Sequence, residues 1–259
     1  MIQKLFAFKA VEVFKTNSNV LGLAAAGSWI TDELDEFSDL DLVVVTKEKI
    51  GGNLEQMRLY AKSLGILLSG FTGEHVGEPR VLICLFDDPL LHVDLKFVTL
   101  EEFHSRVETP AILFDTEGQL DKALKNSEAI FPHPDFQWIE DRFWVWIHYA
   151  LLKIGRGENL EAFDFLSFLR MTSLGPLLHI KNGNLPKGVR KVEAMLMDTE
   201  LKKLTLTIPN YERSSLLSSL NNAVSLYREL REELFDEKIK LNRDAEVRAM
   251  DYFKEISDK

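Results

Sequence analysis

Two aspartates separated by one residue mark the strongest candidate site in the sequence. Asp39 and Asp41 precede the apolar run 42–45, which is typical of a buried β-strand. Alternate residues of a strand point to the same side of a sheet, so both carboxylates would share one face. Such concentrated negative charge is costly unless a divalent cation lies beside it, and Mg²⁺ bound by carboxylates and substrate phosphates is the usual solution. The pair therefore indicates metal-assisted nucleotide chemistry.

Two further segments could complete this site. Gly27 and Ser28 end an earlier apolar run, residues 21–26, and the backbone N–H groups of such a turn could bind terminal phosphates. Asp94 lies in the middle of an alternating segment, residues 90–98, and Lys96 shares its face and could place a cation near the phosphates. If the strands are neighbours, three carboxylates converge and could hold two magnesium ions.

Plainer readings of each motif stay open. A glycine-serine pair alone is a turn, and two aspartates with this spacing are often a solvated strand edge. Asp94 and Lys96 could be ordinary surface residues of a strand, and His92 could be a hydrogen-bonding partner of the site. The joint occurrence of these motifs in a strand context favours a metal site.

These motifs resemble those of the nucleotidyltransferase superfamily of the DNA polymerase β type. The resemblance comprises Gly27-Ser28, the Asp39-Asp41 pair after ten intervening residues, and Asp94; it covers roughly residues 20–98. The chain is most similar to bacterial aminoglycoside and lincosamide adenylyltransferases, which add a helical bundle to the catalytic domain. Asp32 departs from the pattern, because family members often carry glycine there.

The resemblance implies an antibiotic-resistance type of activity: Mg²⁺-dependent transfer of a nucleoside monophosphate, AMP from ATP or another nucleoside triphosphate, to a hydroxyl of a small acceptor. Asp39 and Asp41 would bind both metals. Asp94 would bind the second and accept the hydroxyl proton, while Gly27, Ser28 and Lys96 would contact the donor. Two alternatives are an enzyme that modifies a protein hydroxyl, as antitoxin-type relatives do, and a nucleotide-binding regulator without catalysis.

The elements that would position these residues change in character near residue 131. Strands are predicted at 20–26, 40–46, 80–86, 90–98 and 111–115, and helices at 4–17, 53–68 and 118–129. After a proline-containing linker at 131–134, helices are predicted at 136–155, 160–181, 191–203, 211–238 and 245–257, with 204–208 as a possible extended piece. We expect an α+β catalytic domain with a mixed sheet in residues 1–130 and an all-α helical bundle, binding the acceptor, in residues 131–259.

Charge and composition narrow the partners. The net charge is −10; residues 1–130 carry 21 acidic and 12 basic side chains, and residues 131–259 carry 20 and 19. Acidic charge disfavours long nucleic acids and favours metal ions and a cationic acceptor. No apolar stretch approaches the ~20 residues of a membrane span. Cys84 is the only cysteine and lies in an apolar run, so we expect a buried thiol and a cytoplasmic protein. The oligomeric state is not indicated.

The second half offers weaker candidates. Glu140, Asp141 and Arg142 begin a helix just past the linker, and we consider each a possible substrate contact. The aromatic residues near them are typical of a core, although Trp144 or Tyr149 could line an acceptor pocket.

Overall fold

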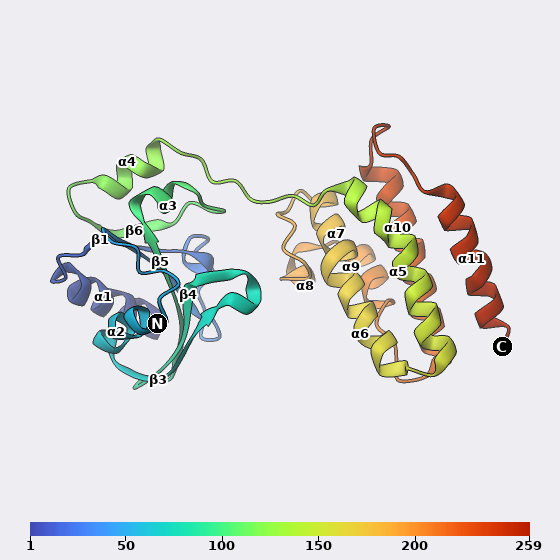
Figure 1. Ribbon diagram of the computed structural model, residues 1–259, viewed down its shortest axis with the longest axis horizontal. Coiled ribbons are helices and arrows are strands. Elements are labelled where there is room, and N and C mark those ends of the chain that lie inside the picture. The colour runs from blue at the N-terminus through green and yellow to red at the C-terminus, as the bar shows by residue number, and fades with distance from the viewer. The chain divides into compact units, whose positions relative to one another are not determined.

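The protein is described by a computed structural model that covers all 259 residues. The chain forms two compact units, Met1–Phe131 and Pro132–Lys259 (Figure 1). The first contains a sheet and helices, and the second is helical. This is the α+β class with a following helical region that the sequence predicts. None of the helices combines the length and apolar composition that a bilayer crossing requires.

A six-stranded mixed sheet forms the centre of the first unit. Its strands are β1 (Val20–Ala25), β2 (Leu40–Thr46), β3 (Ile66–Gly73), β4 (Glu78–Asp87), β5 (Leu91–Thr99) and β6 (Ala111–Asp115). They lie in the order β3-β4-β5-β2-β1-β6; β2 and β5 run parallel, and the other neighbouring pairs are antiparallel. The parallel contact joins two segments that are separated along the chain by the helix α2 (Leu54–Leu64) and by β3 and β4.

The two faces of the sheet are covered by different helices, which are α1 (Ile2–Lys15), α2 (Leu54–Leu64), α3 (Leu100–His104) and α4 (Gln119–Lys125). Helices α1 and α2 pack on one face, over Leu42 and Leu95, where Cys84 is also buried as predicted. Helices α3 and α4 pack on the other face, around Val45 and Val98. Because strand residues alternate, Asp41 lies on this second face, where it is half-buried.

The prediction was wrong at β3. The expected helix 53–68 ends at Leu64, and Ile66–Gly73 forms an edge strand paired antiparallel with β4. Gly70 and Gly73 interrupt its pattern, and most of its side chains are exposed or half-exposed, so no apolar face marks it as a strand. Its conformation depends on hydrogen bonds to β4, which a local pattern does not reveal. The pattern also does not predict the short helix α3.

The second unit is an all-helical bundle, as predicted. Its helices are α5 (Phe136–Arg156), α6 (Asn159–Leu169), α7 (Gly175–Lys181), α8 (Val192–Met195), α9 (Asp198–Thr205), α10 (Arg213–Leu234) and α11 (Arg243–Ser257), with a π-helical turn, Arg170–Leu174, between α6 and α7. The expected helix 191–203 is broken into α8 and α9. Residues 204–208 are not extended: the N–H of Leu206 bonds to the carbonyl of Lys202 at 3.1 Å and continues the helix.

Candidate active site

Two of the three predicted carboxylates, Asp41 and Asp94, lie on one face of two neighbouring strands, and Asp39 lies near them. Asp41 of β2 and Asp94 of β5 are register partners in the parallel pair. Neighbouring strands lie about 4.8 Å apart, so their side chains emerge side by side from the face opposite α1 and α2. Asp39 directly precedes β2, and its charge acts on Asp94. All three are half-buried. The structure therefore brings these carboxylates to one region.

The environment of Asp94 disfavours the ionised form of its carboxyl group. Burial raises the pKa of the Asp94 carboxyl; the charge of His92 works against this effect, and the charge of Asp39 adds to it. His92 Nε2 lies 3.0 Å from Asp94 Oδ1, so His92 is the hydrogen-bonding partner that the sequence suggested. The net direction is upward, because one histidine does not offset burial beside another carboxylate. A cation bound here would stabilise the ionised form.

The glycine turn is fitted closely to Asp41. A Cβ atom at Gly27 would lie 2.0 Å from Asp41 Oδ2, and Gly27 has a φ of +60°. Only glycine allows this approach without strain. Ser28 follows in the same 3₁₀ turn, Gly27–Trp29, and the N–H of Ala26 bonds to the carbonyl of Asp41 at 3.0 Å. The turn and the carboxylate pair are thus one local structure.

Glu108 is a member of this region that sequence reasoning missed. The N–H of Gly27 donates to Glu108 Oε1 at 2.9 Å. Glu108 lies 81 residues from Gly27 and belongs to the loop between α3 and β6, so no spacing or periodicity connects the two.

Lys96 has a different partner from the expected phosphates. Its Nζ lies 2.9 Å from Glu78 Oε2. Hydrogen bonds from Arg80 outweigh the effect of burial and, together with Lys96, lower the pKa of Glu78 to about 2. Lys96 is on the face of Asp94, but in this structure its charge is neutralised by Glu78.

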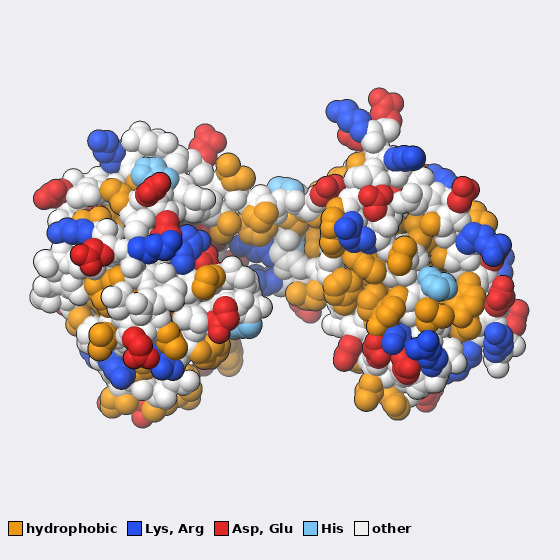
Figure 2. Space-filling view, viewed as in Figure 1, with side chains coloured by type: hydrophobic (Ala, Val, Ile, Leu, Met, Phe, Trp, Pro, Cys, Tyr) orange, Lys and Arg blue, Asp and Glu red, His pale blue; other side chains and the backbone are white.

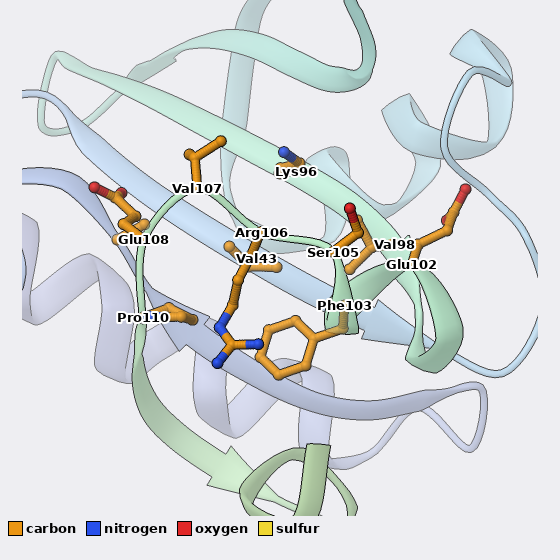
Figure 3. Close-up of a pocket in the computed structure, with 11 residues that line it drawn as sticks. Val43, Lys96, Val98, Glu102, Phe103, Ser105, Arg106, Val107, Glu108 and Pro110 are labelled. Carbon is orange, nitrogen blue, oxygen red and sulfur yellow. The ribbon is translucent and has the colours of Figure 1, made fainter. Parts of the chain in front are cut away.

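A small cavity lies on the same face of the sheet, bordered by Val43 and Lys96, which follow Asp41 and Asp94 by two residues along their strands (Figure 3). Its volume is about 80 Å³. Val43 and Val98 line it from the strands, and Arg106 and Glu108 line it from the 105–110 segment, which runs across this face. The site therefore continues into an apolar hollow beneath a loop.

The fit of a metal ion is partial. The side chains as placed form no group of three or more His, Cys, Asp or Glu that could hold a metal ion. The donor set nevertheless suits Mg²⁺, which proteins usually bind through one or two carboxylates while substrate phosphates and water supply the other ligands. Asp41 and Asp94 are such a pair, with Asp39 near them. Two ions held by three carboxylates stay a prediction.

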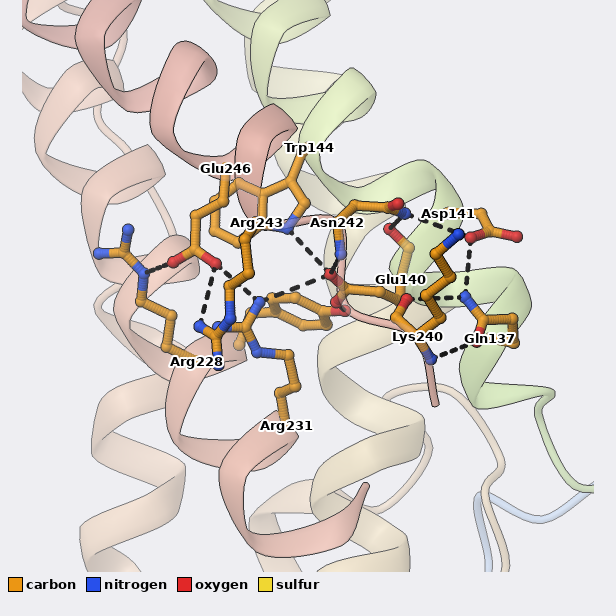
Figure 4. Close-up of polar contacts among 11 residues, drawn as sticks. Gln137, Glu140, Asp141, Trp144, Arg228, Arg231, Lys240, Asn242, Arg243 and Glu246 are labelled. Carbon is orange, nitrogen blue, oxygen red and sulfur yellow. Dashed lines mark hydrogen bonds and ion pairs between the residues drawn. The ribbon is translucent and has the colours of Figure 1, made fainter. Parts of the chain in front are cut away.

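Glu140, which the sequence left open as a possible substrate contact, lies in the core of the helical unit (Figure 4). It is 1% exposed, and its carboxylate accepts hydrogen bonds from the Tyr227 hydroxyl at 2.6 Å and the Asn242 N–H at 2.9 Å. Trp144 is also buried, and its Nε1 donates to Glu140 at 3.3 Å. Neither residue can line an acceptor pocket. Tyr149 remains exposed.

Comparison with known proteins gives distant structural likenesses only. No family model matches the chain, and no curated protein sequence does. It is similar to an aminoglycoside 6-adenyltransferase from Bacillus subtilis, with 16% identity, coverage of 96% of this chain and 97% of that one, and a TM-score of 0.41. A nucleotidyltransferase-like protein from Exiguobacterium sibiricum has 15% identity, coverage of 88% and 75%, and a TM-score of 0.36. A spectinomycin adenyltransferase from Enterococcus faecialis, in complex with ATP and spectinomycin, has 11% identity, coverage of 96% and 99%, and a TM-score of 0.28.

Proposed function

We propose that this chain is a Mg²⁺-dependent nucleotidyltransferase that transfers AMP from ATP to a hydroxyl of a small acceptor. The observation that carries the proposal is the pairing of Asp41 with Asp94 on parallel neighbouring strands, with the Gly27 turn packed against Asp41. Two of the similar solved structures are named as adenyltransferases of antibiotics, but at TM-scores below 0.5 this likeness adds no weight.

In this reaction the glycine turn would bind the donor phosphates and the aspartates would bind the metal ions. The N–H groups of Gly27 and Ser28 donate to the terminal phosphates, and Asp39, Asp41 and Asp94 hold the divalent cations. Bound Mg²⁺ neutralises phosphate charge and lowers the pKa of the attacking hydroxyl. Asp94 accepts the hydroxyl proton as the new oxygen–phosphorus bond forms at the α-phosphate and the bond to pyrophosphate breaks. A metal-bound carboxylate is a weak base, but the cation also lowers the pKa of the hydroxyl, so only modest basicity is required of Asp94.

Lys96 could contact the donor only after its Nζ leaves Glu78. In this proposal an incoming phosphate competes with the Glu78 carboxylate for the same ammonium group, 2.9 Å away in this structure. Lys96 also borders the small cavity, so its side chain is near open space in which a phosphate could approach it.

The charge of the first unit supports a cationic acceptor, such as an aminoglycoside. Residues 1–130 carry a net charge of −9, which attracts polyamines and repels nucleic acids. On the face shown in Figure 2, the Lys and Arg side chains of this unit are interspersed with Asp and Glu and form no continuous basic patch. We assign acceptor binding to the helical unit, residues 131–259, and catalysis to residues 1–130, in the cytoplasm.

The test is a transfer assay. The protein is incubated with labelled ATP, Mg²⁺ and a panel of hydroxyl-bearing antibiotics, and each acceptor is examined by mass spectrometry for the gain of one nucleotide. Removal of the metal with EDTA should abolish the gain, and readdition of Mg²⁺ should restore it. ATP binding without pyrophosphate release on any acceptor would identify a nucleotide-binding regulator instead.

A further inference from the structure

A carboxylate already occupies the position that the proposed function assigns to a phosphate. Glu108 Oε1 accepts the hydrogen bond from the N–H of Gly27 at 2.9 Å. A carboxylate and a phosphate are both anionic oxygen acceptors, and one N–H group cannot donate fully to both. The side chain of Asp41 lies against the same glycine, so a phosphate arriving there would meet two carboxylates. Glu108 has to leave before a donor phosphate binds to this N–H group.

The segment that carries Glu108 is anchored by contacts at both ends, and the residues on either side of Glu108 are exposed to solvent. The Arg106 guanidinium donates to the carbonyl and hydroxyl oxygens of Ser127, each at 2.5 Å, and the N–H of Ile130 donates to the carbonyl of Arg106 at 2.9 Å. Pro110, at the other end, is buried and leads into β6. Between these anchors Val107 and Thr109 are exposed. A displacement of residues 107–109 would therefore leave the contacts of Arg106 and the position of Pro110 in place.

We propose that Glu108 is a determinant of donor affinity, which the triphosphate displaces from the N–H of Gly27. Without a nucleotide, Glu108 satisfies this N–H group and keeps the turn in its fitted position against Asp41. When the donor binds, a phosphate oxygen takes the hydrogen bond, and Glu108 moves away with residues 107–109. This inference rests on the proposed function, because it requires a phosphate at the glycine turn.

The test compares Glu108→Gln with Glu101→Gln in the full chain. Glutamine keeps a hydrogen-bond acceptor for Gly27 but is uncharged and is therefore a weaker competitor of phosphate. Glu101 is an exposed residue of α3 near the same segment, and its substitution removes the same charge. Calorimetry should show that Glu108→Gln binds both MgATP and magnesium tripolyphosphate about fivefold more tightly than wild type. Glu101→Gln should bind both as wild type does.

Each other outcome has a distinct meaning. Equal or weaker binding of both probes by Glu108→Gln, with measurable binding by wild type, overturns the inference and leaves the proposed function standing. A gain for ATP but not for tripolyphosphate overturns it as well, because the exchange involves phosphate alone. If no form of the protein binds either probe, the proposed function fails with it.

A measurement on the unaltered protein guards against a variant that misfolds. Hydrogen–deuterium exchange in residues 107–109 should become faster when tripolyphosphate is added, because displaced Glu108 no longer holds this segment. Unchanged or slower exchange at a saturating concentration of the probe overturns the inference.

Discussion

The two units place carboxylates in opposite surroundings. In the helical unit, burial acts to raise the pKa of Glu246, but hydrogen bonds and charge from Arg231 and Arg228 outweigh burial and lower this pKa (Figure 4). In the first unit, burial raises the pKa of Asp94, and His92 does not compensate for it. The arginines beside Glu246 thus outweigh the effect of its burial on the pKa, whereas the histidine beside Asp94 does not. A carboxylate whose ionised form is destabilised by burial, and whose pKa is therefore raised, is a candidate for metal or substrate binding.

Burial alone does not identify a functional acid. Glu140 is more buried than Asp94, yet hydrogen bonds from Tyr227 and Asn242 satisfy it, and Arg231 lies 3.6 Å away. Through these hydrogen bonds Glu140 connects α5 to α10 and to the start of α11. Removing one partner of a buried ion pair is strongly destabilising, because it leaves the other charge uncompensated.

The largest expected effect is on turnover. Asp41→Asn keeps the size of the side chain but removes a charge from the site, and we expect pyrophosphate release to fall roughly a thousandfold, with little change in the unfolding transition. Asp87→Asn, at the exposed end of β4, serves as the control and should keep wild-type turnover. Near wild-type activity in Asp41→Asn would contradict the proposed role of the carboxylates.

The second prediction concerns stability of the bundle. Arg231→Met should lower the free energy of unfolding by about 3–5 kcal/mol, because Glu246 and Glu140 lose their buried cation. Arg228→Met removes a more exposed arginine from the same carboxylate, Glu246, and should cost about 1 kcal/mol or less. Urea unfolding followed by tryptophan fluorescence measures both. Equal costs would show that burial of Arg231 does not matter.

The third prediction concerns the fit of the glycine turn. Gly27→Ala places a methyl group against Asp41 Oδ2 and should reduce turnover about a hundredfold, because the turn and the carboxylate must move apart. Gly52→Ala is a matched control: Gly52 also has a positive φ, +90°, but an added Cβ would meet nothing within 4 Å. It should show the backbone strain alone, as a small loss of stability with normal turnover. Similar activities in the two variants would refute the importance of the close approach.

The smallest expected effect is a pH dependence of stability. The pKa of Asp94 is raised in the folded state, so this group favours folding below its ordinary value of 3.8, and that contribution is lost as the pH rises through the raised value. Asp94→Asn does not titrate. The melting temperature of the variant, relative to wild type without metal, should therefore increase with pH above 3.8 and then level off. A difference that stays constant or decreases over this range would contradict the direction of the shift. Saturating Mg²⁺ should reduce the difference by stabilising the ionised wild type.

The hydrophobic pattern of the sequence predicts most strands of the first unit, but it does not predict β3. The buried runs of β1 and β2 and the alternation of β5 are properties of short segments, and the structure contains all three strands. β3 has no comparable signal, because it is an exposed edge strand that depends on β4. The burial of Glu140 could not be predicted for a related reason: a polar residue on a helix carries no local sign of the tyrosine and arginine that surround it in the core.

The sequence alone determined that a buried strand would carry Asp41 on the face opposite Leu42, since side chains alternate along any strand, and that a glycine turn would precede it. Only the tertiary structure decided that β5 lies parallel to β2 with Asp94 beside Asp41, and that Glu108 reaches Gly27 from a distant loop. Alternation is a property of the backbone of one segment. Strand order and loop placement depend on which apolar faces are buried together, and this is settled by contacts between residues far apart in the chain.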